Sequence, residues 1–148
     1  MSPVVRESDV LATPGTIWNT CFSDMKWEKW DPDVTELVCI EGGCIEGGTF
    51  NFVMKEGPLK IVPCSMSNVK AEKSLTFSGA AMSGFMKFSG TIDLTPKDDS
   101  TTTVKYSFLM SGLLGYMIAW FNPAVVKGTE MGLANIVRLS EEAGNNSK

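Results

Sequence analysis

The sequence contains no histidine among its 148 residues. This absence excludes Ser–His and Cys–His nucleophilic machinery, histidine acid–base chemistry and metal sites that use histidine ligands. Any proton transfer would have to use Asp, Glu, Lys, Tyr or Cys side chains or an ordered water molecule. We expect neither a bound metal ion nor a cofactor.

The sequence also lacks any CxxC pair, although it contains four cysteines. Neither a zinc ribbon nor a thioredoxin-type motif is therefore present. The first residues do not show the charged-then-apolar pattern of a signal peptide. We interpret Cys21, Cys39, Cys44 and Cys64 as free thiols and expect a reducing, cytoplasmic location.

No cluster of basic residues occurs, because the 13 Lys and Arg residues are scattered and the net charge is −4. This pattern argues against nucleic-acid binding and against electrostatic docking to acidic lipid. The longest strongly apolar stretch, Leu113 to Phe121, is too short to cross a bilayer. The length and the ordinary apolar content of 43% predict one globular domain over residues 1–148.

The first third of the chain predicts one strand and two short helices. Residues 3–11 are typical of a strand. Thr13 as N-cap and Pro14 at the first helical position predict a helix over 14–23, followed by a second short helix within 25–30.

From residue 34 the apolar pattern changes to a period of two. It predicts strands at 34–41, 48–56, 60–70, 73–79, 84–95 and 101–111, joined by short turns such as Gly57-Pro58. Consecutive strands with short connections indicate an antiparallel meander. The strands alternate apolar and polar side chains, so one face of the sheet must be covered.

The remaining region, 112–143, is helical in character and is interrupted at Asn122-Pro123. It predicts a main helix over about 123–143, preceded by a shorter helix or a lid over 113–121. Gly128 and Gly132 lie one turn apart in the main helix, where each costs about 1 kcal/mol relative to alanine. Close approach to the sheet or to a ligand would compensate, and ordinary tight packing is the alternative.

Five segments carry a resemblance to a known superfamily. They are Thr13–Trp18, Trp27–Val34, Gly47–Phe50, Leu75–Gly79 and Gly132–Leu139. In this order they resemble the START-like or Bet v 1-like superfamily, specifically its polyketide cyclase/dehydrase and lipid-transport branch. The resemblance implies an α+β helix-grip fold. In that fold a curved antiparallel sheet of six to seven strands surrounds a long C-terminal helix, with two short helices after the first strand.

The resemblance further implies that an internal cavity binds a small hydrophobic ligand, either a lipid or a polyketide or other aromatic metabolite. The alternative is a polyketide cyclase/dehydratase-like enzyme that folds its substrate and uses Tyr, Asp and water for acid–base chemistry. Which of the two applies stays open at this point. Catalytic positions are not shared across the superfamily, so none is carried over.

The face assignment predicts which residues line such a cavity. Aromatic, methionine and amide side chains make up the predicted ligand-binding set: Trp30, Phe52, Met54, Phe77, Phe88, Tyr106, Phe108, Trp120, Met131 and Asn135. Tyr106 is the best candidate for a hydrogen-bond donor, and a core tyrosine is the alternative. Trp30, Trp120 and Phe121 are candidates for a gate, where contact with a membrane is compatible but unsupported. Monomer and dimer both remain open.

Overall fold

The computed structural model describes residues 3–56, 60–81, 86–111 and 115–146, and the side chains of 115–122 and 146 lie outside the description. One seven-stranded sheet has the order β1-β7-β6-β5-β4-β3-β2. All paired strands are antiparallel. The strands are β1 (Val4–Val10), β2 (Val34–Glu41), β3 (Thr49–Met54), β4 (Ile61–Lys70), β5 (Ser74–Ala81), β6 (Met86–Pro96) and β7 (Thr102–Ser111).

The predicted meander is confirmed, because each strand from β2 to β6 pairs with the next strand along the chain. The first strand then closes the far edge by pairing with β7, in a register that places Val4 opposite Phe108. The expected turn at Gly57-Pro58 and the first two residues of the strand expected at 84–95 lie outside the described residues.

Short helices follow β1, as predicted. They are the α-helix α1 (Pro14–Ile17), the π-helical turn η1 (Trp18–Phe22) and the 3-10 turn η2 (Trp27–Lys29). The Thr13 hydroxyl accepts a hydrogen bond from the Thr16 backbone N–H at 3.2 Å, which confirms Thr13 as the N-cap.

The edge strand β2 is irregular. Its pairing with β3 shifts register between Val34 and Glu36 and again between Val38 and Glu41. Cys39 lies in the second break with a φ of 53°, a left-handed conformation that is uncommon for a residue with a side chain. Such bulges bend a strand and leave a residue without a ladder partner.

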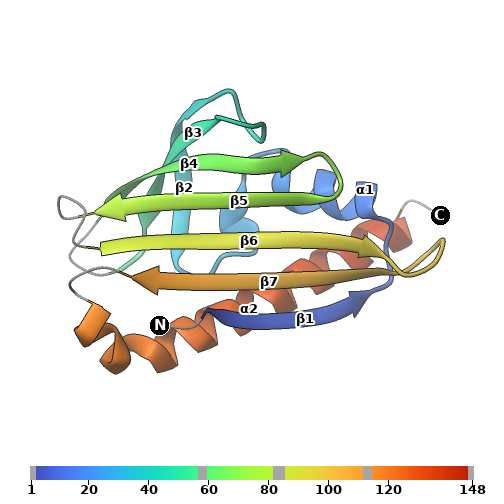
Figure 1. Cartoon of the computed structure of the whole chain (residues 1–148). Coiled ribbons are helices and arrows are strands. Elements are labelled where there is room, and N and C mark those ends of the chain that lie inside the picture. The colour runs from blue at the N-terminus through green and yellow to red at the C-terminus, as the bar shows by residue number, and fades with distance from the viewer. Residues whose placement is uncertain (1–2, 57–59, 82–85, 112–114, 147–148) are drawn as a thin grey trace.

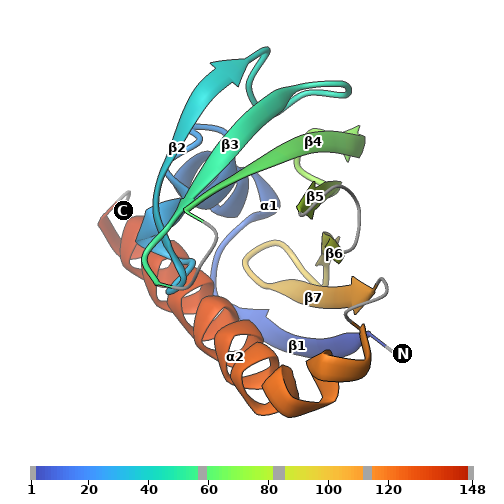
Figure 2. The same ribbon diagram turned by 90° about the vertical axis from the view of Figure 1, so that its left-hand side faces the viewer.

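The C-terminal helix α2 (Gly115–Asn146) is one helix of 32 residues with Pro123 inside it. The expectation of a separate short helix or lid before Pro123 is therefore wrong for residues 115–122, while residues 113 and 114 lie outside the description. Proline removes one backbone hydrogen bond and clashes with the preceding turn, which kinks a helix more often than it ends it when packing supports both sides. The first turns of α2 run at an angle to the rest in Figure 2.

The sheet curves around α2, so that the helix closes the open side of the sheet (Figures 1 and 2). This is the α+β helix-grip arrangement that the sequence predicts. The C-terminal half of α2 lies against β1 and the short helices; Leu133 and Ile136 are buried there. In the described part of the chain, no helix combines the length and the apolar character that crossing a bilayer requires.

Candidate functional site

The inner face of the sheet carries a continuous aromatic cluster. Trp27 is at its centre, with ring centroids 5.3 Å from both Phe50 and Phe77 and 5.6 Å from Trp30. The Trp27 ring is completely buried. Edge-to-face contacts of this kind add to the energy of burial, so the cluster is a rigid wall rather than a loose core.

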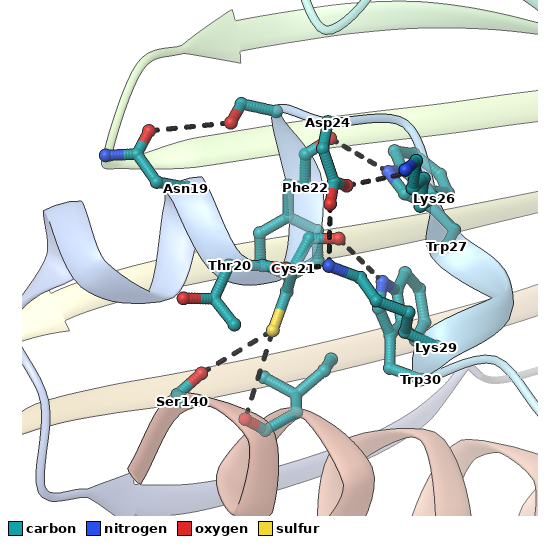
Figure 3. A network of polar contacts seen from close by, with 12 residues as sticks. Asn19, Thr20, Cys21, Phe22, Asp24, Lys26, Trp27, Lys29, Trp30 and Ser140 are labelled. Carbon is teal, nitrogen blue, oxygen red and sulfur yellow. Dashed lines mark hydrogen bonds and ion pairs between the residues drawn. The ribbon is translucent and has the colours of Figure 1, made fainter. Parts of the chain in front are cut away.

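Polar contacts of the short helices hold both tryptophans in place (Figure 3). The indole N–H of Trp27 donates to the Phe22 carbonyl at 3.0 Å, and that of Trp30 donates to the Cys21 carbonyl at 2.9 Å. The Cys21 thiol in turn lies 3.5 Å from the Ser140 hydroxyl of α2. Because every buried indole N–H needs a partner, these bonds fix the orientation of the rings that face the sheet.

Burial of the inner face is graded along the strands. At the end near α1, the inward residues Leu75, Ile92 and Val104 are completely buried. Toward the end of β7 and the start of β6, the inward residues are only partly buried although they belong to the same apolar face. They are Met54, Ala81, Met86, Phe88, Phe108 and Met110. Solvent therefore reaches the inner face at this end, which we call the open end.

A polar turn lies at the side of the interior, between η2 and β2. The Asp31 carboxylate accepts the Asp33 backbone N–H at 3.0 Å, which closes the Asp31-Pro32-Asp33 turn. The Asn135 amide of α2 donates to the Trp30 carbonyl at 3.0 Å and ties this turn to the helix. A side-chain carbon added at Gly128 would lie 3.0 Å from the Asp33 carboxylate, so the glycine gives the carboxylate room.

Tyr106 approaches the same helix one turn further on. A side-chain carbon at Gly132 would lie 3.3 Å from Cε2 of Tyr106 and 3.6 Å from Cε3 of Trp30. Gly128 and Gly132 therefore allow α2 to approach the sheet and the polar turn closely. Tyr106 is 4% exposed. Burial raises its pKa well above the usual value, and the charges of Asp31 and Asp33 raise it further, so the phenol stays protonated.

Burial also raises the pKa of the Asp31 carboxyl from 3.8 to about 6. The Asp33 charge adds to the rise, whereas the bond from the Asp33 N–H and the charge of Lys55 oppose it. Because the pKa of Asp31 is higher in the folded than in the unfolded state, the protonated carboxyl group favours folding. This contribution to the free energy of unfolding is present at acid pH and is lost as the pH rises through about 6.

We therefore predict that Asp31→Asn stabilises the protein at neutral pH. The amide keeps an oxygen to accept the Asp33 N–H but carries no charge that must be desolvated. Because Asp31 is partly accessible, the gain at neutral pH should be about 1–3 kcal/mol, falling toward zero near pH 4. Urea unfolding of both proteins across this pH range measures the difference. Asp99→Asn, an exposed site, is the matched control, and parallel pH curves for wild type and Asp31→Asn would contradict the prediction.

The structure brings most of the predicted ligand-binding set onto the inner face. Phe52, Phe77, Tyr106 and Trp30 are buried there, with Phe88, Phe108 and Met54 nearer the open end. Met131 is the exception. It is 43% exposed and lines a shallow surface depression beside Pro123 and Glu130, so its expected place in the interior is wrong. The side chain of Trp120 lies outside the description.

The error at Met131 has a simple cause. The buried face of α2 runs through Thr129, Leu133, Ile136 and Ser140, which follow each other at intervals of three or four residues. Two of these four are hydroxyl residues, and Thr129 satisfies its hydroxyl by donating to the Val125 carbonyl at 2.9 Å. A prediction based on apolar residues alone overlooks these two hydroxyl residues. It therefore places the buried face of α2 too close to Met131. The predicted ligand-binding set does not include Asp31, although the Asp-Pro-Asp sequence at 31–33 is a signal for a turn whose aspartate side chains bond to the backbone.

A second concave feature lies on the opposite face of the sheet. This groove has a volume of about 780 Å³ and crosses β2 to β7 on the outside. Small polar side chains from neighbouring strands form its floor, among them Ser65, Ser78 and Ser89. Of the predicted ligand-binding set only Phe88 borders it.

The described residues contain no group of three or more Cys, Asp or Glu side chains that could hold a metal ion. All four cysteines are free thiols. Burial raises the pKa of Cys21 to about 11 and raises that of Cys64 still more, so neither is a reactive thiolate at neutral pH.

No protein-family model matches the sequence, and no curated protein matches it. Solved structures do match. A hypothetical protein from Helicobacter pylori has a TM-score of 0.76 at 14% identity, over 93% of this chain and 87% of that chain. Norcoclaurine synthase from Thalictrum flavum, in complex with dopamine and hydroxybenzaldehyde, has a TM-score of 0.67 at 16% identity, over 95% and 89%.

The di-domain ARO/CYC protein of the steffimycin biosynthetic pathway is a third match. Its TM-score is 0.67 at 12% identity, over 99% of this chain and 52% of that chain. At these identities the likeness concerns the fold, and it agrees with the element order and the sheet curved around α2 described above. The chain has the START-like or Bet v 1-like helix-grip fold, also called SRPBCC.

Proposed function

We propose that the protein binds a small hydrophobic molecule between the inner face of the sheet and α2, at the open end. The observation that carries the proposal is the graded burial of the inner face. Six inward apolar residues, including Phe88, Phe108 and Met110, remain partly accessible, whereas Leu75, Ile92 and Val104 toward the other end of the same face are completely buried. Apolar surface left accessible to water in this way is covered favourably by an apolar ligand.

The aromatic lining favours a ligand with an aromatic ring over a flexible lipid chain. The rings of Phe88 and Phe108 stack at 6.0 Å with an interplanar angle of 14°, and so present flat surfaces at the open end. Two proteins with this fold support the class: one is the di-domain ARO/CYC protein of the steffimycin biosynthetic pathway, and the other was solved with dopamine and hydroxybenzaldehyde. The four free thiols suit a reducing compartment.

Neighbouring residues of β7 offer a matched test. Met110 points to the inner face at the open end, whereas Leu109 points to the outer groove. Met110→Trp fills the open end, and we expect it to weaken binding of the neutral fluorescent probe Nile red by at least about tenfold. Leu109→Trp adds the same side chain to the other face and leaves binding unchanged.

Fluorescence titration measures both affinities, and melting curves show that each variant is folded. The opposite result, loss of binding in Leu109→Trp alone, would place the probe in the outer groove and overturn the proposal. Absence of Nile red binding to the wild-type protein would also overturn it.

A further inference from the structure

The Asp31-Pro32-Asp33 turn carries two carboxylates, of which that of Asp33 faces α2 at Gly128, and neither forms an ion pair with a cation among the described residues. The ion pairs among the described residues involve Asp9, Asp24, Glu130 and Glu142, but neither Asp31 nor Asp33. The positive charge of Lys55 lowers the pKa of the Asp31 and Asp33 carboxyl groups, but Lys55 forms no ion pair with either of them. The negative charge of the turn is therefore only partly balanced.

The hydroxyl of Tyr106 is the second feature of this place. Every fully enclosed side-chain nitrogen or oxygen in the described residues has a hydrogen-bond partner. The Tyr106 hydroxyl has no partner among those residues, although the residue is 4% exposed. Its oxygen is consequently not completely sealed by packed atoms but remains accessible to a water molecule.

The helix sets the distance between these groups. Gly128 faces the Asp33 carboxylate, and Gly132 faces the edge of Tyr106 next to its hydroxyl. Gly128 and Gly132 are four residues apart, a rise of about 6 Å along the helix, so the Asp33 carboxylate and the Tyr106 ring lie along the same short stretch of α2. The ring of Trp30 lies alongside, 5.9 Å from the Tyr106 ring.

We propose that the Asp31–Asp33 turn and the Tyr106 hydroxyl form an anchor for a protonated amine carried by an apolar, preferably aromatic, ligand. An ammonium group offers several N–H donors, which suit two carboxylates and a phenol oxygen, and its charge is also attracted by the faces of neighbouring aromatic rings. A carboxylate or phosphate group would be repelled by the same turn. This inference rests on the proposed function and names the class of its ligand.

The anchor is tested with a pair of probes that differ by one group. Tyramine and para-ethylphenol share the phenol and the two-carbon chain, and only tyramine carries the ammonium. Calorimetric titration of the wild-type protein at low salt should show tyramine binding at least about tenfold more tightly. Asp31→Asn and Asp33→Asn should each reduce this preference, whereas the charge-matched control Asp99→Asn should keep it.

The pH provides an independent readout. Tyramine stays protonated throughout, whereas the Asp31 carboxyl becomes protonated as the pH falls through about 6. The preference for tyramine should therefore decline from pH 7.5 toward about pH 5 in the wild type and stay flat in Asp31→Asn. The charged and titratable groups around Asp31 are Asp33 on the same turn, Lys55 after β3 and Tyr106 on β7.

The outcomes separate the two proposals. Equal affinity for tyramine and para-ethylphenol, or a preference that survives both aspartate substitutions, overturns the anchor. Failure of tyramine to bind a protein that still takes up Nile red also overturns the anchor but leaves the proposed function intact. Failure of tyramine and Nile red together overturns both.

Discussion

Trp27→Ala is expected to destabilise the protein by about 3–5 kcal/mol, the range for removing a large aromatic side chain from a core. The indole is completely buried and touches rings from three different elements, including Phe22, Phe50 and Phe77. Its removal leaves a cavity between the short helices and the sheet and also removes one of the two hydrogen bonds that the Phe22 carbonyl accepts, the other coming from the Met25 backbone N–H.

Thermal unfolding measures the effect. At about 2–4 °C per kcal/mol for a chain of this size, the midpoint should fall by roughly 6–20 °C. Ile61→Ala is a suitable comparison, since Ile61 is 57% exposed on β4 and its truncation should change stability by less than about 0.5 kcal/mol. Similar midpoints for the two variants would mean that Trp27 is not the centre of the core.

Gly90→Val is expected to have the second largest effect. Gly90 lies opposite Phe77 on the neighbouring strand, and the Phe77 ring occupies the place that a side chain of Gly90 would need. Movement of the ring is restricted, because Trp27 also packs against it, with ring centroids 5.3 Å apart. Overpacking of this kind lowers the free energy of unfolding by about 1–3 kcal/mol. Because the Phe77 ring has little room to move, we expect a value at the upper end of this range.

The adjacent residue supplies the control. Ser89 points to the outer groove, so Ser89→Val adds the same β-branched side chain without meeting a ring. Valine is favoured in strands, and we expect this variant to be as stable as the wild type or slightly more stable. Urea unfolding of both variants measures the difference. Equal losses at the two positions would show that strand position, and not the Phe77 contact, determines the cost.

The sequence predicts most of the fold, because each element carries its own local signal. Alternation of apolar residues marks β2 to β7, and the Thr13-Pro14 pair marks the start of α1. The break expected before Pro123 is wrong because helix continuity through a proline depends on tertiary support, which no local signal reports. The pairing of β1 with β7 likewise joins residues about a hundred positions apart.

The candidate site is less predictable than the fold. Aromatic residues on the inner face, such as Phe52 and Phe77, follow from the period-two pattern. The Asp31–Asp33 turn does not, since its meaning depends on α2 passing over it at Gly128 and Gly132. Aspartates beside a proline usually mark a solvated turn, and only the contact with the helix gives this pair a different role.

The irregular edge at β2 has a consequence for how the protein behaves at high concentration. An edge strand offers unpaired backbone groups to any other strand, and regular edges therefore promote self-association. In β2 the two register shifts and the left-handed backbone at Cys39 interrupt that row of groups twice within eight residues. A second chain cannot extend a continuous ladder along it, so the bulges protect a large open sheet from edge-to-edge aggregation.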